Sequence, residues 1–386
     1  MLKINIVLFS AILLCVFIYA SYFRADGNQE YNFGLKKSYE HYKKEFMSKD
    51  GRIMDPARNY ITTSEGQSYI MLRSVVSGDR KTFDLSYKWA KNNLQRSDKL
   101  FAWLWGKNKD GEYKILDNNT ASDADVDIAF SLLLAYEKWG NYNYLKEALP
   151  IIISIWNNET KRVGNFLILM PGVNQAQSDK IEVNPSYFSP YAFRFFQKYD
   201  EIHDWDFLID SSYYYLGKVV ETTQTGLPPN WFLIKEINGR EQIVLEDSPR
   251  SDFSYDAIRV FLRVYLDYIR TGEQRALPIL AKTQIFINEW EKTGNLYVNY
   301  KANGELSDKN KFLGSIAVLI PVINMYNADI AASIYKKEIE PHLKDGKYWD
   351  SNKDYYSKNL LWFGCYLYDK NSEEYKDMNK RRIIGY

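Results

Sequence analysis

Cysteine and histidine are scarce in this chain of 386 residues. It has two cysteines, Cys15 and Cys365, and three histidines, His41, His203 and His342. Two cysteines so far apart provide neither a disulfide framework nor a cysteine-based zinc site. The histidines are too scattered to form a recognisable motif, so we expect them to be structural or surface residues.

Glycine and proline are also used sparingly, with 20 and 11 residues, which is below average usage and favours long helices over a turn-rich β architecture. The 50 basic and 49 acidic residues leave a net charge of +1. A nucleic acid is therefore not an expected partner. What the chain has in excess is aromatic residues, at 16%. They supply flat amphipathic faces, which suit a ligand with flat apolar surfaces.

The first residues have the pattern of a membrane anchor or signal peptide. Residues 4–23 are nearly all apolar, with Lys3 before them and Arg24 and Asp26 after them. This run is about long enough to cross a hydrocarbon core of roughly 30 Å. Residues 1–27 are therefore interpreted as a retained anchor or a cleaved signal peptide. Under either interpretation the positive-inside rule places the rest of the chain outside the cytoplasm, on the membrane or secreted.

The remainder, residues 28–386, is predicted to be one helical domain, because no linker or block of like charge divides it. Apolar residues recur at the helical spacing of i, i+3, i+4 and i+7 in eight segments: 67–76, 125–139, 143–156, 206–220, 255–270, 277–290, 311–325 and 356–368. Short turns between them suit antiparallel neighbours. Strand-like segments, such as 166–170 and 231–234, are few.

Two of these helices begin with an apparent capping box. Ser64 with Gln67, and Ser122 with Asp125, have the spacing at which a serine hydroxyl and a side chain three residues later cap the first turn. Acidic residues near such starts are explained by capping and by the helix dipole alone.

Gly66 is not explained by capping or by the helix dipole. It follows Glu65 inside the expected first turn, where glycine costs about 1 kcal/mol relative to alanine. We therefore expect another group to approach the backbone closely at this point.

The acidic segments carry a family resemblance. Residues 121–135 (ASDADVDIAFSLLLA) resemble the signature of glycoside hydrolase family 8, which includes the endoglucanases of bacterial cellulose synthesis. Five further segments are similar to motifs of that family and occur in the expected order: TSEGQSY (63–69), AWLWG (102–106), NPSY (184–187), SYDAIR (254–259) and YSKNLLWFG (356–364).

The resemblance implies an all-α (α/α)6 barrel of six helical hairpins with a groove across one end. It also implies an endo-acting glycosidase that hydrolyses β-1,4 links with inversion and needs no cofactor or metal. Glu65 would be the general acid and Asp256 the general base. The substrate-binding residues would be Asp123, which holds the sugar at the cleavage point, Tyr187, which helps hold the attacking water, Trp103, Arg259 and Tyr255.

These residue types fit the chemistry. A glycosidic oxygen leaves only when protonated, and inversion needs a second carboxylate about 6.5–9.5 Å away to leave room for water. A carboxyl group at a helix start is favoured in its ionised form, however. Glu65 therefore needs an opposing influence, either burial or a neighbouring negative charge. We expect Asp123 to supply that charge from within interacting distance.

Other conspicuous residues are interpreted mainly as structural. The tyrosine-rich segment 211–215 lies in a helical pattern and is expected to pack. Asp125 and Asp127 are expected to cap or pair near the helix start. Trp105 could line either the groove or the core, because indole is amphipathic.

The substrate is the least determined feature. At residues 173–177 (VNQAQ) the resemblance implies an aromatic platform in cellulose-cleaving relatives, which this chain lacks. A more polar subsite suits an N-acetylated or branched glycan better than plain glucan. We expect cellulose or a related β-1,4 polymer that contains amino sugars, in exopolysaccharide biosynthesis or biofilm turnover. An exopolysaccharide synthase complex is a candidate partner beside the membrane.

Two other functions stay open. A non-catalytic glycan-binding or assembly factor of an export complex would keep the groove but tolerate loss of Glu65 or Asp256, and both are present. A polysaccharide lyase would favour a basic groove for its uronic acids, whereas the motifs here are acidic.

Overall fold

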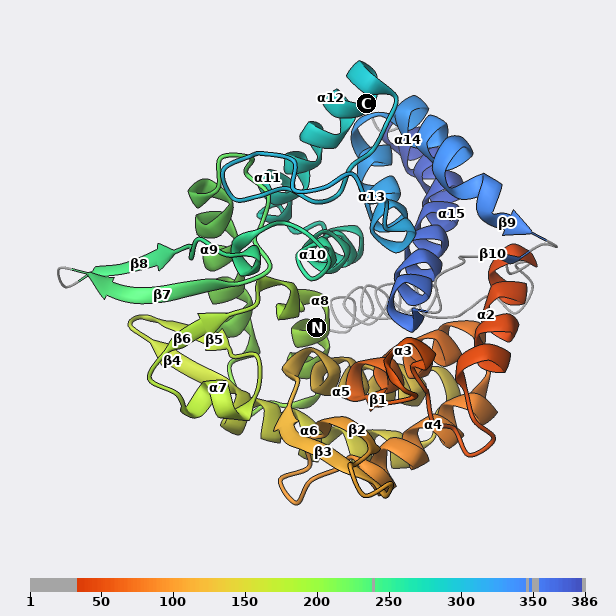
Figure 1. Cartoon of the computed structure of the whole chain (residues 1–386), viewed down its shortest axis with the longest axis vertical. Helices are drawn as coiled ribbons and strands as arrows, with labels where there is room; N and C mark the ends of the chain where they lie inside the picture. Colours follow the sequence, from red (N-terminus) through yellow and green to blue (C-terminus); the bar gives the residue numbers. More distant parts are fainter. Residues whose placement is uncertain (1–32, 238–239, 345–346, 349–353, 384–386) are drawn as a thin grey trace, which may run out of the picture.

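Six helices form a closed ring at the centre of the protein (Figure 1). The structure, a computed structural model, describes residues 33–237, 240–344, 347–348 and 354–383. Within these residues each ring helix packs against the next, and α15 returns to contact α3. In chain order the ring consists of α3 (Ser64–Ser77), α5 (Ser122–Trp139), α8 (Pro190–Tyr199), α10 (Ile258–Thr271), α13 (Leu313–Tyr326) and α15 (Tyr355–Ile383).

A second layer of helices covers the ring from outside (Figure 1). Each outer helix or helix pair follows an inner helix and packs near it, except the first, which packs against α15 from the other end of the chain. The outer helices are α2 (Phe33–Phe46), α4 (Arg80–Asn93), α6 (Tyr142–Glu159), α9 (Trp205–Thr222), α11 (Ala276–Leu280) with α12 (Gln284–Thr293), and α14 (Ala328–Ile334). This largely helical architecture is consistent with the (α/α)6 barrel that the sequence predicts.

Burial explains the two layers. In α5 every residue from Ser122 to Ala135 is buried, as expected for a helix surrounded by protein. The outer α4 instead buries one face, which includes Phe83, Tyr87 and Ala90, and exposes its lysines. An apolar stripe of this kind docks an outer helix on the ring.

The helices α13 and α15 approach to backbone contact. A methyl group added at Gly364 of α15 would lie 2.3 Å from the backbone oxygen of Ala317, and one at Gly314 of α13 would lie 2.5 Å from that of Ser357. Glycine at both positions therefore sets the separation of these two ring helices.

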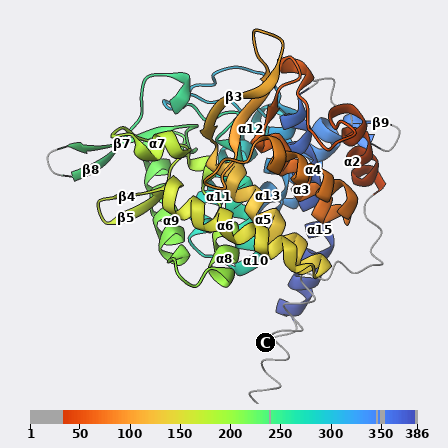
Figure 2. The ribbon, with the colours of Figure 1, turned by 90° about the horizontal axis from the view of Figure 1, so that it is seen from below.

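Short strands lie in the loops between helices. A three-stranded antiparallel sheet has the order β1 (Thr62–Thr63), β2 (Ala102–Lys107), β3 (Tyr113–Thr120). The others are β4 (Thr160–Val163) with β5 (Phe166–Leu169), β6 (Ile181–Val183) with β7 (Phe232–Ile237) and β8 (Arg240–Val244), and β9 (Leu343–Lys344) with β10 (Lys347–Tyr348). A short helix, α7 (Val173–Gln177), follows β5. The hairpins β4–β5 and β7–β8 lie on the same side of the barrel in both views (Figures 1 and 2).

Most of the predicted helices are confirmed, with two differences in extent. The segment 255–270 is helical only from Ile258, and 277–290 is interrupted by a 3₁₀ turn at Ala281–Thr283. The predicted strands at 166–170 and 231–234 correspond to β5 and β7.

Both predicted capping boxes are wrong. The residue that caps α3 is Thr63, whose side chain accepts from the Gly66 N–H at 3.1 Å. Gln67 turns into the core instead and donates to the backbone oxygens of Gly51 and Ser86.

The second box fails in the same way. Ser122 donates to the Met170 carbonyl, and Asp125 accepts from the Phe101 N–H. Tertiary contacts therefore use the side chains that the local pattern assigns to capping.

The predicted membrane segment, residues 4–23, lies outside the described residues. Among the helices that the structure does describe, none combines the length and the apolar character needed to cross a bilayer.

Candidate active site

A cavity of about 510 Å³ opens at the end of the barrel where the inner helices begin. Six of the seven residues that the sequence predicts for the site line it: Glu65, Trp103, Asp123, Tyr187, Tyr255 and Asp256. The seventh, Arg259, is buried against three of these side chains. The structure therefore brings together residues from five separate segments of the chain.

Helix starts explain this convergence. Glu65 and Asp123 are each the second residue of an inner helix, α3 and α5, and Asp256 lies two residues before α10. Tyr187 ends a 3₁₀ turn that precedes α8. Because these inner helices begin at one end of the ring, residues in their first turns meet there.

Arg259 holds the acids in one group. Its side chain is only 2% exposed. Nη1 donates to Glu65 Oε2 at 2.9 Å and to Asp123 Oδ2 at 2.5 Å, and Nη2 reaches Asp256 Oδ1 at 3.4 Å. A buried guanidinium needs such partners, because an unpaired charge in the interior is costly. Arg259 thus holds the carboxylates directly.

Glu65 has the protonation behaviour of an acid catalyst. Burial raises its pKa, the charge of Arg259 lowers it and the charge of Asp123 raises it again, with a result of about 7. The expected proximity of Glu65 and Asp123 is confirmed, since both bind the same guanidinium nitrogen. A helix start favours the ionised form of Glu65, and both burial and the charge of Asp123 oppose this effect. Burial is the larger of the two.

Asp256 has different surroundings. Its side chain is 35% exposed, against 19% for Glu65. Oδ2 lies 3.3 Å from Trp231 Nε1 and 3.4 Å from Asn184 Nδ2, and both nitrogens donate to it. Two carboxyl groups in one cavity, one more buried and one more open, provide the contrast on which acid and base roles depend.

Three aromatic residues complete the predicted set. Tyr187 places its ring 5.3 Å from the Arg259 guanidinium, and burial raises the pKa of its hydroxyl. Trp103 comes from β2. Tyr255 stacks on Tyr356 with ring centres 4.3 Å apart. Each of these rings lines the same cavity as the acids.

Sequence reasoning missed Tyr355, the first residue of α15. Its hydroxyl donates to Glu65 Oε1 at 3.0 Å and lies 2.7 Å from Thr63 Oγ1. One signal pointed to it. A methyl group added at Gly66 would lie 3.2 Å from the Tyr355 ring, so the close approach expected from that glycine is confirmed.

Four further polar residues at the site were not singled out. Asp55, Arg58 and Asp354 line the cavity, and Asn184 contacts Asp256. Asp354 accepts from the Tyr255 hydroxyl, and Asp55 accepts from Arg58 at 2.6 Å. Asp55, Asn184 and Asp354 directly precede a helix or 3₁₀ turn, and Arg58 ends a 3₁₀ turn. No periodic pattern marks such positions.

The residues expected to be structural lie elsewhere. His41 and His203 contact Glu45 and Asp200, respectively, and no histidine lines the cavity. Trp105 packs with Tyr113 and the Arg52 guanidinium rather than lining the cavity.

The expected packing roles are confirmed at two more places. Asp127 pairs with the buried Arg263 at 2.9 Å. In the tyrosine-rich segment, Tyr213 donates to Asp267 and Tyr214 stacks on Phe166.

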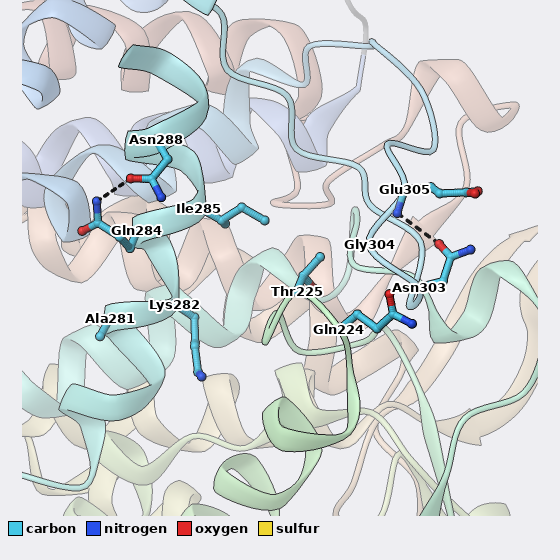
Figure 3. A pocket seen from close by; sticks show the side chains of 10 residues that line it. All are labelled: Gln224, Thr225, Ala281, Lys282, Gln284, Ile285, Asn288, Asn303, Gly304 and Glu305. Carbon is cyan, nitrogen blue, oxygen red and sulfur yellow. Dashed lines mark hydrogen bonds between the residues drawn. The ribbon is translucent and has the colours of Figure 1, made fainter. Parts of the chain in front are cut away.

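A second depression, beside α12, has different chemistry (Figure 3). Four of its ten lining residues carry amide side chains, and Gln284 donates to Asn288 at 2.8 Å. Glu305 is the one carboxylate among its lining residues, and no aromatic ring is there. It therefore lacks the paired acids and the flat surfaces of the cavity at the helix starts.

Comparisons with known proteins agree with this geometry. The family model described as "Glycosyl hydrolases family 8" matches residues 12–370. An endoglucanase of Escherichia coli (strain K12) is 36% identical over 233 residues, which are 59% of this chain and 61% of that protein. An endoglucanase of Pseudomonas fluorescens (strain SBW25) is 31% identical over 250 residues, 63% of this chain and 62% of that protein. The matched region thus spans about three fifths of the length of these curated relatives.

Solved structures match over more of the chain. The endo-1,4-D-glucanase from Vibrio fischeri ES114 superposes with a TM-score of 0.73 and 26% identity, over 86% of this chain and 94% of that one. The endo-β-1,4-glucanase from Acetobacter xylinum gives 0.71 and 24%, over 88% and 99%. At 24% identity the second likeness concerns the fold alone.

Proposed function

The chain belongs to glycosyl hydrolases family 8, and on that premise we propose that it is an endo-acting glycosidase that hydrolyses a β-1,4-linked glucan with inversion. The observation that carries this proposal is the pair of acids at one cavity. Glu65 is 19% exposed and has a pKa near 7, and Asp256 is more open to solvent at 35%. The curated relatives with matching sequence are endoglucanases.

The chemistry assigns one proton transfer to each acid. Glu65 donates its proton to the glycosidic oxygen as the bond from that oxygen to the anomeric carbon breaks. Asp256 accepts a proton from the water whose oxygen forms the new bond to that carbon. Both carboxyl groups then exchange protons with solvent to restore the starting state.

The other cavity residues bind and orient. Asp123 is fixed by Arg259 and is placed to accept hydrogen bonds from the sugar at the cleavage point. The Tyr187 hydroxyl helps to hold the attacking water, and Trp103 offers a ring face for a sugar. Tyr255 lines the wall and is held by Asp354.

The substrate proposal includes cellulose and related β-1,4 polymers with amino sugars. Residues 173–177 form the short helix α7, which carries amide side chains and no aromatic ring. Asp354 adds a carboxylate to the cavity wall, and Asp55 is paired there with Arg58. A panel of β-linked polysaccharides, analysed for product length by mass spectrometry, identifies the sugar and separates endo from exo action.

Location is part of the proposal. The apolar run at 4–23 supports a membrane anchor or signal peptide, which places the enzyme outside the cytoplasm or at the cell membrane. Exopolysaccharides emerge there, so we propose a role in their synthesis or in biofilm turnover, with an exopolysaccharide synthase complex as a partner.

Two amide substitutions test the catalytic roles. Glu65→Gln and Asp256→Asn should each lower the rate on soluble β-1,4-glucan at least about 100-fold, because each removes one proton transfer. Binding of a cello-oligosaccharide and the urea unfolding midpoint should change little. Asp206→Asn, at an exposed acid in the first turn of α9, is the matched control and should keep full activity.

The same assays separate the alternatives. A hydrolase releases reducing ends without an unsaturated product, whereas a lyase releases a product that absorbs ultraviolet light. A glycan-binding assembly factor would bind the oligosaccharide without turnover in any variant. Full activity in Glu65→Gln or in Asp256→Asn would refute the assigned role.

A further inference from the structure

Two buried carboxyl groups lie together beneath the cavity, and the proposed reaction does not use them. Asp125 of α5 and Glu159 at the end of α6 are both 0% exposed. Their side chains are within hydrogen-bonding reach of each other. Among the salt bridges of the described residues, none joins either group to a lysine, arginine or histidine. They are therefore unlike Asp127 on the same helix, which pairs with Arg263.

Each carboxyl group has one satisfied oxygen and one that lacks a donor. Asp125 Oδ1 accepts from the Phe101 N–H at 2.8 Å, and Glu159 Oε1 accepts from the Thr120 hydroxyl at 2.5 Å. Asp125 Oδ2 and Glu159 Oε2 are buried, and no donor from the described residues reaches them. Two ionised carboxylates cannot donate to each other, but one proton between them satisfies both free oxygens.

The pair sits at the junction that fixes Asp123. Thr120, which donates to Glu159, also accepts from the Val173 N–H at 3.0 Å. The Glu159 carbonyl accepts from the Met170 N–H, and the Ser122 hydroxyl donates to the Met170 carbonyl. The end of α6, the loop at 170–173 and the first turn of α5 are therefore joined around the two carboxyl groups.

We propose that Asp125 and Glu159 share one proton as a buried acid–carboxylate pair, and that this pair positions the first turn of α5, and with it Asp123, beneath the cavity. Both are positioning residues, since neither lines the cavity. The inference rests on the proposed function only for the role of Asp123. The shared proton itself is a property of the fold.

The two acids that act on the pair each have an arginine partner, Arg259 for Asp123 and Arg96 for Asp98. Asp123 faces the pair from the same helix and Asp98 from the loop before β2. Burial raises the pKa of the pair above the usual range of a carboxyl group, so the folded chain keeps the shared proton to a higher pH than the unfolded chain does. The stability that the pair contributes is fully present below the usual carboxyl pKa and is lost as the pH rises toward the raised pKa of the folded pair.

The test is the pH dependence of urea unfolding. All proteins carry Glu65→Gln, because the raised pKa of Glu65 would otherwise add a dependence of the same sign. In this parent the unfolding constant should rise with pH, by up to tenfold per pH unit between about 5 and 8. Asp125→Asn and Glu159→Gln each replace the shared proton with an amide donor. Both variants should fold and should lose most of this pH dependence.

Asp127→Asn is the matched control. It changes a buried acid of the same helix whose partner is an arginine, so it should lower stability and leave the pH dependence of the parent intact. The proposal is overturned if both amide variants retain the slope of the parent, or if the parent itself has no slope over this range.

A binding measurement tests the link to Asp123. In the Glu65→Gln parent, Asp125→Ala should weaken binding of a cello-oligosaccharide at least tenfold at pH 5, and Asp125→Asn should restore it to within about threefold. If Asp125→Ala fails to fold, the pH dependence of binding is compared between the parent and the two amide variants. Oligosaccharide binding by the parent should weaken toward pH 8, whereas binding by Asp125→Asn and Glu159→Gln should stay constant. Unchanged binding in Asp125→Ala, or an equal weakening in all three proteins, would refute positioning. No binding in any protein would count against the proposed function, and the unfolding slopes would still decide the shared proton.

Discussion

At the scale of single residues, surroundings rather than residue type distinguish the acids of the cavity. Glu65 and Asp256 share the guanidinium of Arg259. Glu65 is the more buried and also faces Asp123, whereas Asp256 has Trp231 and Asn184 as donors and more solvent. One arginine thus holds two carboxyl groups whose surroundings differ in burial and in hydrogen-bond donors.

Tyr355→Phe tests how a hydrogen-bond donor controls the proton affinity of Glu65. The Tyr355 hydroxyl donates to Glu65 and lowers its pKa. Its removal should raise the pKa from about 7 by about one unit, since a hydrogen bond to a charged group is worth roughly 1.5 kcal/mol. Because Glu65 must be protonated to act, the alkaline limb of kcat against pH should move upward by the same amount.

Tyr356→Phe is the control for that shift. Its ring lines the same cavity, but its hydroxyl donates to the Tyr255 carbonyl instead of to Glu65. Its alkaline limb should stay near pH 7. An alkaline limb that stays in place or moves downward in Tyr355→Phe would contradict the assigned hydrogen bond.

The sequence alone locates the acids but not their partners. Glu65, Asp123 and Asp256 stand beside helix starts, which are local patterns. Tyr355 lies 290 residues from Glu65, and no spacing rule connects the two. Gly66 indicated that a group comes close without indicating which one.

At the scale of elements, periodicity is informative where a helix is uniform and fails where it changes type. The 3₁₀ turn at Ala281–Thr283 went unnoticed because residues three apart share a face in both kinds of helix. The outer helices α2, α4 and α14 and the hairpin of β2 and β3 were also missed. Their polar residues dilute the apolar pattern, and α2 packs against α15 from the other end of the chain.

Gly364→Ala tests the backbone contact between α13 and α15. The added methyl group would meet backbone atoms of Ala317 and Val318, which cannot move without separating the helices. We expect a loss of about 1–3 kcal/mol in the free energy of unfolding, as in other overpacked cores. Urea denaturation measures it.

Gly217→Ala in α9 provides the comparison. The added methyl group has no neighbour within 4 Å, and alanine is the better helix former, so stability should rise by about 0.5–1 kcal/mol. A similar change in both variants would show that helix propensity rather than close packing governs Gly364.

At the scale of the whole molecule, the barrel is joined across its first and last described helices. Trp362 Nε1 donates to the Leu35 carbonyl at 3.1 Å, and Asn359 Nδ2 donates to the Tyr42 hydroxyl at 3.0 Å. The contacts of this seam begin at α2, which starts at Phe33, beyond the proposed membrane segment.

A chain that starts at Asn28 should therefore keep the barrel intact. We expect the same urea midpoint and the same kcat as for the full chain, because the contacts that close the ring among the described residues begin at α2. In cell fractionation, the full chain should partition with membranes or be exported, and the shortened chain should do neither. Equal partitioning of the two chains would refute the proposed role of residues 4–23.

Because α15 is made after the other ring helices, it also determines when the cavity is complete during synthesis of the chain. Tyr355 and Tyr356 reach the cavity only on the helix that closes the ring. A nascent chain that has made α3, α5 and α10 already carries every acid of the proposed reaction, yet it lacks this wall of the cavity. We therefore expect no glycan cleavage before α15 has been made and has closed this wall of the cavity.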